Sequence, residues 1–245
     1  MSGSQKNVVV GFDPDGRMEL IHVGEQPGHG AAVDFRRVTL RGISSQPLVR
    51  ACGERGRLLD TTAGLGGDSW ILAAAGFSIT AIERSALVCQ VLRDGVDRAK
   101  GDSRLNAIAS RIEVRQENAV DVLQANSDSW ATIYLDPMYP PKIGSALAPK
   151  PIRVVRAAVG DDLDSSNLFL AAVAAQWNRI VVKRPHHAEP LCAEPDIIFN
   201  SKLVRYDVYV REGSSLGPFA QRRSHECPMD FCATIAAQRA IDLSS

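Results

Sequence analysis

Asp60-Thr61-Thr62-Ala63-Gly64-Leu65-Gly66-Gly67-Asp68 is the stretch of sequence that decides the fold. It follows an apolar run over residues 57–60 that predicts a strand, and it opens a segment over residues 69–75 that predicts a helix. Glycines between a strand and a helix permit a tight turn and a close approach of the backbone to a ligand. The free N–H groups at the helix N-terminus supply hydrogen-bond donors. The stretch therefore predicts a ligand-binding loop.

Strands and helices alternate along the chain on both sides of this loop. Further strands are expected over residues 78–83, 112–115, 132–135 and 179–183, and further helices over residues 86–100, 119–125 and 164–177. Such repeated units predict an α/β, Rossmann-like fold with a mostly parallel sheet that is covered by helices on both faces. Two last apolar runs, 197–202 and 204–210, are separated by one residue, which predicts an antiparallel C-terminal strand.

The two ends of the chain differ from this central pattern. Short strands are expected over residues 7–12, 18–23 and 31–35, with a turn at Asp13-Pro14-Asp15-Gly16 and a short helix over residues 46–52. Beyond Val210 the sequence becomes rich in Gly, Ser and Arg. We therefore predict three parts, which are a small β-rich N-terminal subdomain (1–52), an α/β domain (53–212) and a C-terminal tail (213–245) whose role the sequence does not indicate.

Composition limits the classes of function. The chain has 245 residues, of which 45% are hydrophobic, and its 28 Lys+Arg balance its 28 Asp+Glu. A formal charge of zero argues against a protein that coats nucleic acid without specificity, although a local basic patch is compatible with it. The five cysteines form no CxxC pair and no zinc-finger spacing, which indicates free thiols in a reducing compartment. With neither a signal pattern nor a membrane-length apolar run, we expect a cytoplasmic protein.

An acidic residue follows the second strand of the predicted sheet. Glu83 lies about 20 residues beyond the glycine loop, where an acidic side chain meets ribose hydroxyls in nucleotide-binding folds. A dinucleotide would place its pyrophosphate at the helix N-terminus, where the carboxylate of Asp68 would repel it. The ammonium and sulfonium of S-adenosylmethionine would be attracted by Asp60 and Asp68. The loop with Glu83 therefore favours a methyl donor over a dinucleotide, and a turn without a ligand is the structural alternative. Asn118 after the third strand is either an adenine contact or a helix N-cap.

Leu135-Asp136-Pro137-Met138-Tyr139-Pro140-Pro141-Lys142 ends the fourth strand of the predicted sheet. This segment places a carboxylate, rigid backbone carbonyls and an aromatic face at the strand tip. Such groups can hold a planar nucleobase and accept hydrogen bonds from its exocyclic amine. The structural alternative is a turn-forming Asp-Pro pair with Tyr139 packed against the fold.

Asp136-Pro137-Met138-Tyr139 resembles the [Asp/Asn]-Pro-Pro-[aromatic] motif of amino-group methyltransferases that act on nucleobases. Residues 33–210 resemble the RsmJ family, bacterial enzymes that modify N2 of a guanine in small-subunit (16S) ribosomal RNA. The matching segments are Asp60–Gly66, Ile82-Glu83-Arg84, Tyr134–Pro140, Ser145-Ala146-Leu147, Val159–Asp164 and Val181–Pro185. The resemblance implies a class I methyltransferase whose cofactor residues are Gly67, Asp68, Glu83, Arg84, Asn118, Ala119 and Asp136, in addition to the loop residues Asp60, Gly64 and Gly66. This chain departs from the family at Gly67, where Arg is common, and at Asn118-Ala119, which replaces a pair of small hydroxyl residues.

The predicted chemistry is an in-line methyl transfer to the exocyclic amine of guanine. Asp136 and the carbonyl of Pro137 would orient the amine, and Tyr139 would stack on a base that has been unstacked from its helix. No metal is required, and the adjacent His186 and His187 lack a third ligand. The partner is small-subunit ribosomal RNA or the ribosomal subunit, and no protein partner can be inferred.

Basic residues near the carboxyl ends of the strands are candidate RNA contacts. The main candidates are Lys142, Lys183 and Arg184, followed by Lys150, Arg153 and Arg156, and then by Arg36, Arg37, Arg41, Arg222 and Arg223. Two alternative functions remain open at this point. One is an amino-group methyltransferase acting on adenine or cytosine in DNA, on another RNA or on a small-molecule amine, and the other is a catalytically silent RNA-binding protein.

Overall fold

The computed structural model describes residues 8–125, 128–138, 150–159 and 165–211. Tyr139, Lys142, Arg222, Arg223 and the predicted tail lie outside these ranges, and so do most of the segments 145–147 and 159–164. None of the helices in the described part of the chain has the length and hydrophobicity that spanning a bilayer requires. Cys52, Cys89 and Cys192 are free thiols.

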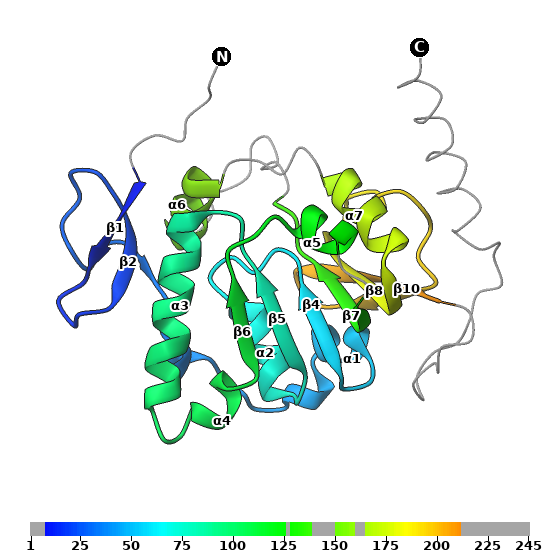
Figure 1. Cartoon of the computed structure of the whole chain (residues 1–245), viewed down its shortest axis with the longest axis horizontal. Coiled ribbons are helices and arrows are strands. Elements are labelled where there is room, and N and C mark those ends of the chain that lie inside the picture. Colours follow the sequence, from blue (N-terminus) through cyan, green and yellow to red (C-terminus); the bar gives the residue numbers. More distant parts are fainter. Residues whose placement is uncertain (1–7, 126–127, 139–149, 160–164, 212–245) are drawn as a thin grey trace, which may run out of the picture.

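The centre of the molecule is a seven-stranded sheet in the order β6-β5-β4-β7-β8-β10-β9 (Figure 1). Its strands are β4 (Arg57–Asp60), β5 (Ser78–Ile82), β6 (Ile112–Arg115), β7 (Ser129–Leu135), β8 (Gln176–Pro185), β9 (Ile197–Asn200) and β10 (Val204–Val210). The pairs from β6 through to β8 are parallel, whereas β10 runs antiparallel to both β8 and β9. The predicted Rossmann-like fold with an antiparallel C-terminal strand is thereby confirmed.

The order of the strands positions a ligand crevice. From β4 the chain moves outward to β5 and β6, and it then crosses back to β7 on the other side of β4. The connections after β4 and β7 therefore leave in opposite directions. In open α/β sheets a crevice forms at such a switch point, outside the carboxyl ends of the strands. The loop after Asp60 and the segment after Leu135 both begin at this point.

Helices cover both faces of the sheet, and each face has its own apolar core. Neighbouring residues of a strand point to opposite faces, so Leu58 belongs to one core and Leu59 to the other. Helices α1 (Pro47–Cys52), α2 (Gly67–Ala74), α3 (Ala86–Gly101) and α6 (Lys150–Val159) supply residues to the first core. Helices α5 (Ala119–Ala125) and α7 (Ser165–Ala174) supply residues to the second. The two-sided cover that the alternating pattern predicts is confirmed.

Some element boundaries differ from the prediction. Helix α7 ends at Ala174 rather than at residue 177, because pairing with β7 already begins at Gln176. Trp177 is therefore a strand residue, and its Nε1 donates to the carbonyl of Val173 at 3.0 Å. Helices α4 (Asn106–Ala109) and α6 were not predicted. In the sequence, Lys and Arg residues interrupt the apolar pattern of α6, although the helix buries Val154 and Val155.

The N-terminal strands form a separate sheet of three, β1 (Val8–Phe12), β2 (Met18–His22) and β3 (Ala31–Ala32). Strand β3 is shorter than expected, since Asp34 accepts from the N–H of Arg36 at 3.2 Å and caps a 3-10 helix, η1 (Phe35–Arg37). A second 3-10 helix, η2 (Ile43–Ser45), precedes α1. Phe35 stacks on Trp70 of α2 with ring centroids 4.2 Å apart. The small sheet packs on α3 and α6 at the left of the molecule (Figure 1), whereas α1 packs against β8, β9 and β10.

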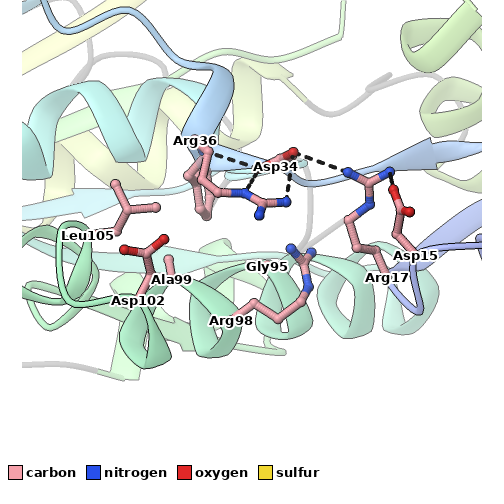
Figure 2. Close-up of a pocket in the computed structure, with 10 residues that line it drawn as sticks. Asp15, Arg17, Asp34, Arg36, Gly95, Arg98, Ala99, Asp102 and Leu105 are labelled. Atoms are coloured by element: carbon pink, nitrogen blue, oxygen red, sulfur yellow. Dashed lines mark hydrogen bonds and ion pairs between the residues drawn. The ribbon is translucent and has the colours of Figure 1, made fainter.

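A polar cavity of about 550 Å³ lies between the small sheet and α3. Figure 2 shows Arg17 and Arg36 meeting Asp34 on one side of it, while Arg98 of α3 and Asp102, which follows α3, lie on the other. Arg17 contacts Asp34 at 3.1 Å, and Arg98 donates to the carbonyl of Val33 at 2.6 Å. The second of these bonds ties the N-terminal part to the second half of α3. The first residue of α3 lies at the carboxyl edge of the large sheet, so this half of the helix lies away from that edge. The cavity is therefore separate from the ligand crevice.

Gly95 in the middle of α3 provides a test of this packing. A Cβ atom built there would lie 2.3 Å from Cγ1 of Val33, whereas in the part of the chain that the structure describes nothing lies within 4 Å of a Cβ at Gly101 in the same helix. We expect Gly95→Ala to lower the free energy of unfolding by roughly 1–3 kcal/mol, because overpacking outweighs the helix propensity of alanine. Gly101→Ala should be neutral or stabilising by up to about 1 kcal/mol. Denaturant unfolding of both variants measures the difference, and equal stabilisation would contradict the packing.

Candidate active site

The crevice at the switch point is lined by the carboxyl ends of four parallel strands and by α6 and α7. Six of the predicted site residues line it together, namely Gly64, Glu83, Arg84, Asn118, Ala119 and Asp136. Apolar side chains close the other side, among them Ile82, Val155 and Leu168. The crevice thus joins a polar edge that comes from the loops with an apolar wall, an arrangement suited to a ligand that has both a ring and charged groups.

The glycine loop owes its shape to two residues with positive φ. Gly64 has φ +55°, and Gly66 has φ +76° and is the N-cap residue of α2. A Cβ at Gly66 would also lie 2.5 Å from Cδ1 of Leu92, so a larger residue fits there neither in conformation nor in space. Gly67 is the first residue of α2 and is exposed, and no atom of the described residues lies within 4 Å of a Cβ built there.

Glu83 is fixed against the loop by backbone donors. Its Oε2 accepts from the N–H of Gly64 at 3.0 Å, and its Oε1 accepts from the N–H of Ser85 at 2.7 Å. The side chain of Ser85 then caps α3 through the N–H of Val88. Glu83 is 5% exposed and lines the crevice, so its carboxylate is held there in one orientation. A fixed carboxylate here is what recognition of a ribose diol requires.

Lys183 of β8 joins two acidic residues from different parts of the site. Its Nζ contacts Oδ2 of Asp68 at 2.8 Å and Oδ2 of Asp136 at 2.8 Å. The Oη of Tyr134 donates to the same Asp68 oxygen at 2.6 Å. Burial lowers the pKa of Lys183, but the two carboxylates outweigh it and raise that pKa above its usual range. The lysine is therefore an ammonium across the working pH range.

The loop and the Asp-Pro segment are also connected through two threonines. Thr61 donates through its N–H and its Oγ1 to the carbonyl of Tyr134, at 3.0 and 2.8 Å. The Oγ1 of Thr62 accepts from the N–H of Asp136 at 2.7 Å. These bonds fix the backbone of Asp136 relative to the glycine loop. Neither threonine was predicted to have a role, and the signal that could have indicated one is their position at the end of a strand that neighbours β7.

Asp60 lies beneath the loop rather than in the crevice. It is 1% exposed, its Oδ2 accepts from the hydroxyl of Ser69, and its Oδ1 accepts from the N–H of Thr62 at 3.2 Å. Burial raises the pKa of Asp60 to about 7, helped by the nearby carboxylates of Asp68 and Asp136 and opposed by these hydrogen bonds. Asp60 therefore shapes the loop through its bonds to Ser69 and Thr62, and a direct contact with the cofactor stays a prediction.

Comparison with known proteins identifies the protein family to which the chain belongs. A family model described as "Putative SAM-dependent methyltransferase" matches residues 14–211. The ribosomal RNA small subunit methyltransferase J of Ectopseudomonas mendocina is 38% identical over 210 residues, which are 81% of this chain and 81% of that protein. The chain belongs to the ribosomal RNA small subunit methyltransferase J family. The member from Thioalkalivibrio sulfidiphilus is 42% identical over 181 residues, which cover 71% of this chain and 70% of that protein.

A solved structure agrees with this family assignment. The SAM-dependent methyltransferase from Neisseria gonorrhoeae superposes with a TM-score of 0.65 at 28% identity, and the match covers 87% of each chain. As a member of a SAM-dependent methyltransferase family, the chain takes S-adenosylmethionine as its cofactor. The predicted family and cofactor are thereby confirmed.

Two positions at which the chain departs from the RsmJ pattern have clear structural settings. Gly67 offers no side chain to the crevice, so a contact there comes from the backbone alone. The Oδ1 of Asn118 accepts from the N–H of Val120 at 2.9 Å, which caps α5, while the residue also lines the crevice. The N-cap and the adenine contact are therefore compatible roles for one side chain. Ala119 follows it, is buried, and adds to the apolar wall.

The candidate RNA contacts divide by exposure. Arg153 of α6 is exposed, whereas Lys183 is occupied by two carboxylates. Arg184 is 6% exposed, and its Nη2 donates to the carbonyl of Glu189, so its guanidinium faces the protein interior and we leave it out of the RNA surface. Arg36 is ion-paired with Asp34 next to the polar cavity.

Proposed function

We propose that this member of the RsmJ family transfers a methyl group from S-adenosylmethionine to the N2 amine of a guanine in small-subunit ribosomal RNA. The observation that carries the proposal is the placement of Asp136. Its backbone is tied to the glycine loop through Thr62 at 2.7 Å, and its carboxylate is paired with Lys183 at 2.8 Å. A carboxylate is thus fixed at the carboxyl edge of the sheet, beside the cofactor crevice that it helps to line.

The residues of the crevice fit S-adenosylmethionine. The carboxylate of Glu83 is oriented for ribose hydroxyls, Asn118 and the apolar wall can receive adenine, and Asp68 is an anion near the loop. A ligand with a sulfonium and an ammonium is attracted by such acidic groups, whereas a pyrophosphate is repelled. When bound, the cofactor supplies an activated methyl group, and the chain supplies binding, orientation and electrostatics.

The reacting amine has to be oriented, because the lone pair of a guanine N2 is delocalised into the ring. Hydrogen bonds from the amine to Asp136 and to the carbonyl of Pro137 would direct the lone pair out of the plane. In the transfer the N2–methyl bond would form as the sulfonium–methyl bond breaks, which leaves a neutral thioether. The Asp136 carboxylate would stabilise the positive charge that develops on N2, and the surplus proton would pass to solvent. Electrostatic stabilisation and positioning of this kind are the main contributions that enzymes make to such transfers.

The RNA itself must present an unstacked base to this edge of the sheet. Tyr139 and Lys142 lie outside the described residues, and their assignment to base stacking and phosphate contact stays a prediction. Arg153 on α6 is exposed close to the crevice wall that Val155 and Val159 form. We therefore place phosphate contacts on α6, which joins the crevice to the N-terminal sheet.

The identity of the methylated nucleoside tests the proposed function. Incubation of the full chain with small subunits or their RNA and methyl-labelled S-adenosylmethionine is expected to label the RNA, and complete digestion should yield N2-methylguanosine. Small subunits from cells that lack this protein are the appropriate substrate, because their target base is unmodified. Label in N6-methyladenosine or N4-methylcytidine would instead support the adenine or cytosine alternative. Cofactor binding without any transfer would support a silent RNA-binding protein.

A further inference from the structure

Lys183 occupies a position that an RNA contact does not explain. It extends from β8 to Asp68 at the start of α2 and to Asp136 at the end of β7, and its side chain is only 23% exposed. Both contacts are 2.8 Å, so the ammonium is directed toward the interior of the site rather than toward solvent. A lysine that binds phosphate as a mobile point charge is usually extended on the surface. The structure gives this lysine a fixed internal partner instead.

The groups around the pair form a small charged cluster. The titratable side chains around it in the described residues include Asp60 of β4, Asp68 of α2, Tyr134 of β7, Tyr206 of β10 and the buried thiol of Cys52 of α1. Burial raises the pKa of both tyrosines, so they stay neutral. Lys183 is thus a cation shared by Asp68 and Asp136, and Asp60 lies near both of these carboxylates. Without it, Asp136 would face the like charges of Asp68 and Asp60.

We propose that Lys183 is a positioning residue that holds Asp136 ionised and aimed, so that the site offers an acceptor-only carboxylate to the substrate base. The proposal rests on the proposed function, because it concerns how guanine is selected. An opposite charge within about 4 Å favours the ionised form of a carboxyl group, and a hydrogen bond fixes its orientation. Lys183 supplies both to Asp136.

An ionised carboxylate distinguishes guanine from adenine. Guanine presents two neighbouring donors, N1–H and the N2 amine, and the two oxygens of an ionised carboxylate can accept from both. Adenine presents its amine beside the N1 lone pair, so one carboxylate oxygen would face another acceptor. A protonated Asp136 would lose this discrimination, since it would carry a donor of its own. The Lys183–Asp136 pair therefore makes guanine the favoured base.

The pH dependence of the single-turnover rate tests this role. In Lys183→Met the acid limb of the profile should move to higher pH by about 1–3 units, because Asp136 takes up a proton more readily. Lys183→Arg should restore most of the wild-type profile. Asp68→Asn should move the acid limb to lower pH. The variant removes one negative charge near Asp136, and the ammonium of Lys183 then no longer divides its ion pairing between two carboxylates. Lys202→Met, an exposed lysine in the β9–β10 turn at the same edge, is the matched control and should follow the wild type.

Three results would overturn the inference. An acid limb in Lys183→Met that coincides with the wild type would show that the lysine does not hold Asp136. A raised KM for RNA with an unchanged kcat and pH profile would make Lys183 a phosphate contact. A weaker Kd for S-adenosylmethionine by calorimetry, with kcat unchanged at saturation, would make it a cofactor ligand. If Lys183→Met does not fold, Lys183→Arg and Asp68→Asn still test the predicted directions. Failure of the proposed function is separate, since it would show in the wild-type product.

Discussion

Asp136→Ala is expected to lower kcat by roughly 10²- to 10⁴-fold, the range typical for loss of a group that stabilises developing charge or moves a proton. The variant removes the carboxylate that we propose orients the guanine amine, and it leaves Lys183 with the carboxylate of Asp68. Rates should be measured at saturating S-adenosylmethionine, with the cofactor Kd determined separately. We expect the loss in kcat to exceed any rise in Kd, although the side chain also lines the crevice.

Two further variants make this prediction specific. Asp136→Asn keeps one oxygen acceptor, so its rate should lie between those of the wild type and Asp136→Ala. Asp128 immediately precedes β7 at the opposite end of the strand, where it pairs with the exposed Arg57 at 2.8 Å. Asp128→Ala should leave kcat unchanged and cost at most about 1 kcal/mol of stability. A wild-type rate in Asp136→Ala would remove this residue from the mechanism.

The glycine loop, Glu83 and Asp136 could be predicted from the sequence because each lies at the end of an apolar strand. In a parallel sheet such ends meet at one edge, so a pattern that is local in sequence fixes a site in space. Local apolar patterns likewise predicted β4, β6 and α5 with the bounds that the structure shows. Local signals of this kind suffice wherever function depends on which strand end a residue occupies.

Contacts between distant segments could not be predicted in this way. The direction of Lys183 depends on the β7–β8 register and on Asp68 at the start of α2, 115 residues away in sequence. The hydroxyl of Thr62 accepts from the N–H of Asp136, which lies beside it only because the chain crosses from β6 to β7 next to β4. Arg184 looked like a surface cation because burial is a tertiary property. Helix α6 was missed for a related reason, since its buried side is recognisable only against the small sheet and α3.

Asp60 is expected to make the stability of this protein fall as the pH rises toward neutrality. Its pKa in the folded state is about 7, against a usual value of 3.8, so the native state retains a proton that the unfolded chain has lost. The stabilisation is fully present below about pH 4 and is lost as the pH rises through 7. At 1.36 kcal/mol per pKa unit, the folded protein loses on the order of 4 kcal/mol across this interval.

Asp60→Asn removes the titrating group and keeps its hydrogen bonds, since an amide can accept from the N–H of Thr62 and donate to the hydroxyl of Ser69. Chemical denaturation at pH 5 and pH 8.5 should show the variant more stable than the wild type by a small margin at the lower pH and by a larger margin at the higher one. Asp34→Asn is a control in which the pH dependence of stability should change in the opposite direction. Hydrogen bonds from Arg36 hold the pKa of Asp34 below its usual range, so that variant should lose stability at neutral pH and converge with the wild type in acid.

The Asp60→Asn variant also relates the stability of the protein to its affinity for the cofactor. A buried carboxylate that is costly to ionise is tolerated where a cationic ligand benefits from its charge, and S-adenosylmethionine carries a sulfonium and an ammonium. We therefore expect Asp60→Asn to bind the cofactor more weakly than the wild type at pH 8.5 while being the more stable protein. In the wild type, cofactor affinity should rise as the pH passes through about 7, because Asp60 then becomes ionised. A variant that gained stability without losing affinity would show that the charge of Asp60 does not act on the ligand.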